Sequence, residues 1–332
     1  MRYRWLTALL AVAMVVAACG GDTADGDDGD GDELFRIAVV APSATNDLAF
    51  TQSMVDAVNL VADAMGGASA VEVAVTDQTF VVEDAAAAIR DYASDGYDLV
   101  IAHGSQYGES LGQIAPEFPD VSFAWGTDTD TFGLDNVYAY TAASDEGGYV
   151  QGVMAALLTE SGTVGVVGPI EVGDAKAYVD GFVNGAAATD AAVTVNVVYT
   201  GSFGDVAAAS ETANAHIANG ADVMTGSAQM VVGAVAVGQQ NGTLWFGTQS
   251  NQTSLADDIV VSSQVYHWEV ILEEIVDNIE NGVLGGESFV LTLANGGLVI
   301  EFNDGYDLPS DVRDAADQAI DDVAGGMSTG VG

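Results

Sequence analysis

The sequence predicts an α/β protein with two doubly wound parallel-sheet lobes, and three observations carry this prediction. Short runs rich in β-branched residues alternate with longer segments of helical periodicity, which is the pattern of βαβ units. The alternation starts a second time after Asn136. After an N-terminal leader, about 300 residues remain, a length that accommodates two units of ordinary size.

The first series of elements begins with the apolar run Arg36-Ile37-Ala38-Val39-Val40-Ala41, which predicts a buried strand. The periodicity then predicts a helix at 46–66, a strand at 71–76, a helix at 82–95 and a strand at 98–102. Strands that are joined through helices run parallel, so both faces of this sheet are expected to be covered.

The second series repeats the same order. Helices are expected at 148–158, 175–188, 205–219 and 230–239, and strands at 163–167, 193–199, 223–225 and 244–247. A strand at 259–264, a helix at 268–281 and a last strand pair within 289–302 are left over when this second unit is complete. The leftover elements indicate that the chain returns to both units.

The first nineteen residues predict a secretory signal peptide that ends in a cysteine. Arg2 and Arg4 precede an apolar run, 6–16, that is too short to span a bilayer as a helix. Cys19 is the single cysteine, and the order Val16-Ala17-Ala18-Cys19 resembles the lipobox of bacterial lipoproteins. The resemblance implies that the thiol of Cys19 is acylated after cleavage and holds the protein at the outer face of a membrane. An ordinary signal peptide with an incidental cysteine is the alternative.

Residues 20–34 consist mainly of glycine and aspartate and predict an acidic tether, because they cannot bury enough apolar surface to order themselves. The Asp-Gly-Asp repeats also suggest a calcium loop, but no downstream glutamate completes one. Like charges extend a linker, which favours the spacer.

Charge excludes some partners. The whole chain carries −43, and loss of Arg2 and Arg4 leaves four cationic side chains against 49 acidic ones, a net charge of −45. Such a field repels nucleic acid and anionic lipid surfaces. The acids are scattered along the chain, so they indicate a surface adapted to a salty medium and not a cation-binding pocket.

Ligands of open parallel sheets bind outside the carboxyl ends of the strands, on the loops that lead into helices. The loops expected to form a site are therefore 42–52, 103–110, 125–130, 168–174, 226–230 and 248–253.

Seven segments of the chain occur in the order of a known family. Residues 46–52 are similar to an Asn-Asp-x-Ser-Phe-Asn segment, and residues 146–156 match a Glu-x-x-Tyr-x-x-Gly-x-x-Ala-Ala helix. The other segments are 104–107, 116–123, 181–185, 199–205 and 220–223. Together they resemble the basic membrane lipoprotein family, the receptors for purine nucleosides of ABC importers, from Ile37 to about Asn303.

This resemblance implies a type I periplasmic-binding-protein fold whose chain crosses three times between the lobes. The expected segments are 35–140 plus 265–283 for lobe 1, 141–264 plus 284–310 for lobe 2, and 311–332 for a C-terminal helix and flexible tail. The lobes of such receptors close on a small-molecule solute and present a joined surface to a permease, which an ATPase drives. A sensor lipoprotein of the same fold, which signals to a partner, is the alternative.

The resemblance also implies a ligand site in the cleft. A purine needs aromatic faces for stacking and polar groups for its edges. Phe50 matches the aromatic residue of the family's first loop, beside Asn46 and Asp47; the alternative is that these two cap a helix and Phe50 is core. The complete set of candidate ligand-binding residues is Asn46, Asp47, Phe50, Gln52, Ser105, Gln106, Tyr107, Trp125, Asp128, Gln249, Asn251, Tyr266 and Trp268.

Departures from the family pattern put nucleoside specificity in question. Where members read Gly-Val-Asp-Ser-Asp-Gln, residues 247–252 read Gly-Thr-Gln-Ser-Asn-Gln, and Tyr266 stands where members have a lysine. Gln249 still donates and accepts, and Tyr266 or Trp268 can stack, although Trp268 can equally be a packed helix residue. Asp128 is either a ligand acid or a turn acid. A free nucleobase or another small polar aromatic solute is the alternative ligand.

Enzymatic activity is not expected. His103, His216 and His267 are far apart, and the sequence has no Gly-x-Ser-x-Gly elbow, P-loop or metal-spaced cluster. Residues 162–168 have the wrong spacing for a dinucleotide loop. His103, at the end of a predicted strand, either faces the cleft or is buried with its hydrogen bonds satisfied. We expect no cofactor and no metal.

Overall fold

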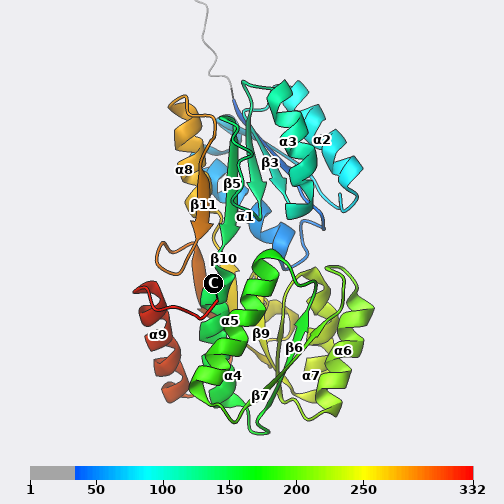
Figure 1. Ribbon diagram of the computed structural model, residues 1–332, viewed down its shortest axis with the longest axis vertical. Helices are drawn as coiled ribbons and strands as arrows, with labels where there is room; N and C mark the ends of the chain where they lie inside the picture. The colour runs from blue at the N-terminus through cyan, green and yellow to red at the C-terminus, as the bar shows by residue number, and fades with distance from the viewer. Residues whose placement is uncertain (1–33, 332) are drawn as a thin grey trace, which may run out of the picture. The chain divides into compact units, whose positions relative to one another are not determined.

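Two six-stranded sheets organise residues 34–331, the part of the chain that the computed structural model describes (Figure 1). The first has the order β11-β5-β4-β3-β1-β2 and the second the order β12-β10-β9-β8-β6-β7. The first sheet consists of β1 (Phe35–Val40), β2 (Val71–Thr76), β3 (Leu99–His103), β4 (Ser122–Gly126), β5 (Val137–Ala142) and β11 (Ser288–Leu291). The second consists of β6 (Thr163–Gly168), β7 (Thr194–Tyr199), β8 (Val223–Gly226), β9 (Leu244–Gln249), β10 (Val260–Tyr266) and β12 (Leu298–Phe302).

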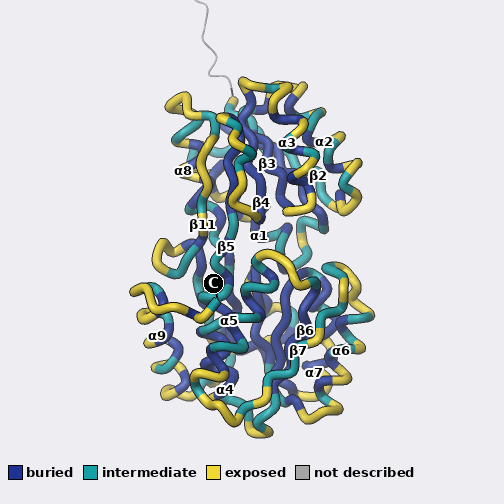
Figure 2. The backbone as a smooth tube through the Cα atoms, in the orientation of Figure 1, coloured by how far each residue is buried: buried dark blue, intermediate teal, exposed yellow. Residues whose placement is uncertain are grey.

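Helices cover both faces of each sheet. In the first lobe, α1 (Phe50–Ala64) and α8 (Glu269–Glu280) pack on one face, and α2 (Val82–Ser94) and α3 (Gly108–Ile114) on the other. In the second lobe, α4 (Ser144–Leu158), α5 (Gly173–Thr189) and α9 (Ser310–Ala324) pack on one face, and α6 (Val206–Ala218) and α7 (Val232–Asn241) on the other. Burial on both faces explains the near-continuous apolar strands, which Figure 2 shows as buried.

The strand order reverses at the same place in both sheets. β1 pairs in parallel with β2 on one side and β3 on the other, and β6 pairs in the same way with β7 and β8. Such a reversal separates two adjacent loops and opens a crevice at the carboxyl ends of the strands. Each lobe therefore supplies one half of a cleft.

The chain crosses between the lobes at three points, as predicted: between β5 and α4, between β10 and α8, and between β11 and β12. Backbone hydrogen bonds tie the crossings together. Ala143 N donates to Leu291 O over 2.9 Å, and His267 N donates to Gly297 O over 2.8 Å. The two doubly wound lobes and their hinge confirm the predicted fold class.

Two predicted details need correction. The two strands expected within 289–302 do not pair with each other, because β11 pairs with β5 in parallel and β12 pairs with β10 in antiparallel orientation. Residues 288–291 therefore belong to the first sheet and not to lobe 2, which is where the sequence predicts 284–310. The C-terminal segment, predicted to be a flexible tail, packs against the second lobe: Thr329 is buried, and Asn184 Nδ2 donates to Thr329 O over 3.0 Å.

Strand β5 and helix α3 were not predicted, and strand β4 was implied only by the family segment 116–123, whereas the other main elements lie close to their expected bounds. Cys19, the signal peptide and residues 20–33 of the tether lie outside the described residues. Among the helices of residues 34–331, none combines the length and the apolar character needed to cross a bilayer.

Candidate ligand-binding cleft

A cavity of about 500 Å³, including its part open to solvent, lies where the carboxyl ends of both sheets meet. Its walls come from loops that follow strands of both lobes, as the position of the reversal predicts. The lining residues are Pro42, Phe50, Phe80, Gly104, Ser105, Gln106 and Thr127 from the first lobe, and Val172, Gly173, Asp174, Ala175, Phe203, Ala228, Gln229 and Gln249 from the second.

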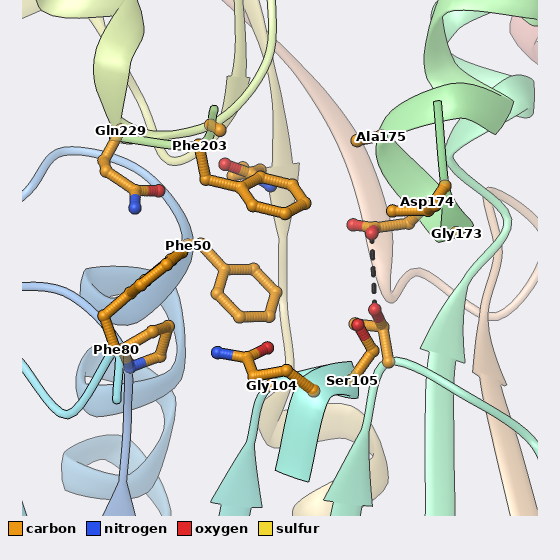
Figure 3. Close-up of a pocket in the computed structure, with 15 residues that line it drawn as sticks. Phe50, Phe80, Gly104, Ser105, Gly173, Asp174, Ala175, Phe203 and Gln229 are labelled. Atoms are coloured by element: carbon orange, nitrogen blue, oxygen red, sulfur yellow. Dashed lines mark hydrogen bonds between the residues drawn. The ribbon is translucent and has the colours of Figure 1, made fainter. Parts of the chain in front are cut away.

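Aromatic side chains from opposite lobes line the cavity. Figure 3 shows Phe203, from the loop after β7, on one side and Phe50 and Phe80 on the other. Phe80 has 53% of its surface exposed, which is unusual for a phenylalanine and places an apolar face at the mouth. This arrangement fits a flat, apolar-faced ligand, because aromatic rings prefer stacked or edge contacts with other rings.

A buried histidine supports Phe50 from behind. The rings of His103 and Phe50 are stacked, with centroids 3.8 Å apart and planes 15° apart. His103 Nε2 lies 3.0 Å from Phe50 O, and Nδ1 lies 2.8 Å from the Tyr140 hydroxyl. A carbonyl only accepts, so Nε2 carries the proton and the Tyr140 hydroxyl donates to Nδ1.

Burial lowers the pKa of His103 to about 3, despite the opposing hydrogen bond to Phe50 O, so the ring is neutral at physiological pH. His103 is therefore the buried, hydrogen-bonded histidine of the two alternatives. Its role at the cleft is to hold the Phe50 backbone and ring in place.

The acid of the cavity is Asp174, in the first turn of α5. Thr127 Oγ1 donates to Asp174 Oδ1 over 3.3 Å, the bond drawn in Figure 3, and the Tyr266 hydroxyl donates to Oδ2 over 3.1 Å. Burial raises the pKa of Asp174, and the hydrogen bonds from Tyr266 and Thr127 oppose that rise. Thr127 belongs to the first lobe and Asp174 to the second, so this bond spans the cleft.

Backbone strain and an unpartnered polar atom mark the second lobe's side of the cavity. Ala228 and Gln249 both have φ of 71°, a region that residues with a Cβ rarely adopt. Gln249 is 3% exposed, and its Oε1 has no hydrogen-bond partner. Strained residues and unsatisfied buried polar atoms gather at ligand sites, where a ligand supplies the missing contact.

Four of the thirteen predicted site residues line the cavity: Phe50, Ser105, Gln106 and Gln249. Four others lie directly behind it. Tyr266 holds Asp174, and Trp268 is fully buried with its ring edge-on to His103. The Tyr107 hydroxyl donates to Thr79 O, and Trp125 Nε1 donates to Gly104 O.

The remaining five predicted residues lie outside the lining. Asn46 is exposed, and Asp47 accepts from the N–H groups of Ala49, Thr51 and Gln52, which is a capping role at the start of α1. The Gln52 side chain accepts from Leu48 N. Asp128 accepts from the next two backbone N–H groups in a turn, and Asn251 donates to Glu301.

Four important lining residues were not among the predicted ones: Phe80, Asp174, Phe203 and Gln229. Sequence signals existed for three of them. Asp174 and Gln229 belong to the predicted loops 168–174 and 226–230, and Phe203 to the family segment 199–205. Nothing in the sequence distinguished Phe80, because the loop after β2 was not among the expected site loops.

Comparison with known proteins adds an independent observation. The profile of a family described as ABC transporter substrate-binding protein PnrA-like (Bmp) matches residues 34–324. The chain belongs to this family. The description of the family makes the chain an ABC transporter substrate-binding protein.

Two relatives of this Bmp protein have names that refer to a ligand. A purine-binding protein from Brucella abortus is 27% identical over 77% of this chain and 71% of its own length. The ABC transporter nucleoside-binding protein BmpA of Lactococcus lactis is 23% identical over 96% of this chain and 95% of its own. A solute-binding protein of an ABC transporter system from Conexibacter woesei has the same fold, with a TM-score of 0.72 and 24% identity over 88% of this chain and 96% of its own.

Proposed function

We propose that this Bmp-family protein binds a purine nucleoside or a free purine base in the cleft and delivers it to the permease of an ABC importer. The observation that carries the proposal is the pair of aromatic walls, Phe50 from one lobe and Phe203 from the other. A ring held between them gains stacking contact on both faces. The names of the Brucella and Lactococcus relatives support the same ligand class.

Closure of the lobes couples binding to delivery. The lobes contact each other through Ser250 Oγ, which donates to Ala49 O over 2.8 Å, and through the Thr127–Asp174 bond. A ligand that touches both lobes stabilises the state in which these bonds form. The closed lobes then present one joined surface to a permease, with an ATPase as the further partner.

We place the protein at the extracytoplasmic face of a membrane, held by a lipid on Cys19. The support is the lipobox-like order before Cys19 and the acidic tether after it. Cys19→Ser is expected to release the protein from the membrane fraction, while the unchanged protein stays bound. Equal membrane association of both would count against the anchor.

Ligand binding is tested by calorimetric titration of the protein without residues 1–19, in salt at about 1 M to screen its charge. Nucleosides, nucleobases, sugars and amino acids are the ligands. We expect purines to bind and Phe50→Ala and Phe203→Ala each to weaken binding about 10- to 100-fold, since a stacked base contributes about 1–3 kcal/mol per aromatic face.

Phe132→Ala is the matched control, because Phe132 stacks on Trp125 and does not line the cavity. It is expected to leave purine affinity unchanged. Binding of sugars or amino acids alone would contradict the purine assignment and leave the fold and the transport role intact.

A further inference from the structure

Asp174 is the single ionisable side chain among the described residues that line the cavity. No lysine or arginine of the lining stands opposite it. A carboxylate removed from water without a cation nearby is costly unless hydrogen bonds satisfy it. Its protein partners in the cavity wall are two neutral hydroxyls, those of Thr127 and Tyr266.

These partners leave acceptor capacity on both oxygens. Thr127 donates to Oδ1 and Tyr266 donates to Oδ2, so each oxygen accepts one hydrogen bond from a side chain, and the backbone N–H groups of Asp174 and Ala175 also stabilise the carboxylate. An ionised carboxylate has about four lone-pair sites, so each oxygen can accept once more. Ligand groups that form hydrogen bonds with this carboxylate from within the cavity must therefore be donors.

From this geometry we infer that Asp174 determines ligand specificity by accepting a pair of donors on neighbouring ligand atoms. The inference rests on the purine ligand proposed above. Two parts of such a ligand present paired donors: the N1–H and 2-amino groups of a guanine-type base, and the 2′- and 3′-hydroxyls of ribose. A carboxylate takes either pair with one bond to each oxygen, and charge-assisted bonds of this kind are stronger than neutral ones.

Two further observations agree with a donor-bearing ligand. Gln249 Oε1 is buried on the same side of the cavity without a partner, and it is also an acceptor in the assigned orientation of the amide. Asp174 also lies in the first turn of α5, where the helix dipole favours a negative charge. This position opposes the rise in the pKa of Asp174 that burial causes and so favours the form that accepts hydrogen bonds.

The test compares Asp174→Asn with Asp180→Asn by calorimetric titration. Asp180 lies on the same helix, pairs with Lys176 and does not line the cavity, so its substitution changes the net charge equally. The ligands are guanosine, 2′-deoxyguanosine, guanine, adenosine and 2′-deoxyadenosine. Asp174→Asn replaces one acceptor with a donor, and we expect it to weaken binding of the matching ligands about 10- to 100-fold, with Asp180→Asn unchanged.

The ligand series separates the two sources of the donor pair. If the base supplies it, guanosine, 2′-deoxyguanosine and guanine lose affinity and both adenine nucleosides do not. If ribose supplies it, guanosine and adenosine lose affinity and the two deoxynucleosides and guanine do not. Either pattern supports the role of Asp174.

The role is overturned if Asp174→Asn binds all ligands as the control does, or if it weakens all five equally, since 2′-deoxyadenosine offers no such pair. A melting curve of each variant shows whether the folded state is kept. Failure of the unchanged protein to bind any of the purines is a different result, because it contradicts the proposed function itself.

Discussion

Removing a single hydroxyl behind the cleft should measurably destabilise the protein. Tyr140→Phe deletes the group that donates to His103 Nδ1 over 2.8 Å, and leaves the stacking of His103 on Phe50 in place. Both Tyr140 and His103 are fully buried. No water reaches the histidine nitrogen, so it would remain an unsatisfied acceptor.

The expected cost follows from that burial. A buried polar group left without its partner costs about 1–3 kcal/mol, more than the net value of an ordinary hydrogen bond. Tyr138→Phe, on the same strand β5, is the matched control. Its hydroxyl donates to Val283 O, and Val283 is 42% exposed, so water can replace the lost donor. We expect this control to cost less than about 1 kcal/mol.

Urea titration followed by tryptophan fluorescence and circular dichroism measures the free energy of unfolding of the three proteins at constant salt. The larger loss should belong to Tyr140→Phe. Equal losses, or no loss for Tyr140→Phe, would refute the assigned protonation and bonding of His103.

Three other predictions concern stability. The hydrogen bond to Glu269 raises the pKa of His267, so the stability that His267 contributes is complete below pH about 6.5 and is lost as pH rises through the raised pKa. In urea titrations, the free energies of unfolding of the unchanged protein and of His267→Gln should therefore become equal above that range. A difference that stays constant with pH would contradict the interaction. Gly152→Ala places a Cβ 2.1 Å from Phe182 O and should cost about 1–3 kcal/mol in the same titration. A Cβ at Gly112 would make an ordinary van der Waals contact with the Phe132 ring at 3.4 Å, so Gly112→Ala should be neutral or stabilising. Raising the salt concentration from about 0.1 M to about 1 M should raise the melting temperature, because salt screens the repulsion among the acidic side chains. A lower melting temperature at high salt would show that this repulsion is not the dominant effect.

Most of the fold could be predicted because its signals are local. The apolar run at 36–41 and the helical periodicity after it match β1 and α1, since burial on both faces of a parallel sheet selects a continuous apolar strand. The partners of β11 and β12 could not be predicted, because their pairing joins residues that are distant in the chain, such as Ser288 with Ala139 and Ser262 with Phe302, and leaves no local pattern.

Part of the site was predictable by the same logic. Phe50, Ser105, Gln106 and Gln249 lie at the carboxyl ends of strands, which the alternation locates without any tertiary information. The sequence did not predict which side chains of a loop face the cavity. Asp47 belongs to the same loop as Phe50, yet its carboxylate satisfies backbone N–H groups of α1 and does not reach the cavity.

The sequence by itself determined the two parallel-sheet lobes, the loops that build the cleft and the family to which the chain belongs. These properties depend on strand and helix periodicity and on loop motifs, which are patterns of neighbouring residues. Only the tertiary structure decided that Phe203 faces Phe50, that His103 supports it, and that Asp174 joins Thr127 across the cleft. These pairs come from different lobes or from elements that are far apart in the sequence. The contact between His103 and Phe50 depends on the packing of the first lobe, whereas the pairs that join the lobes depend on how the hinge brings the two sheet edges together.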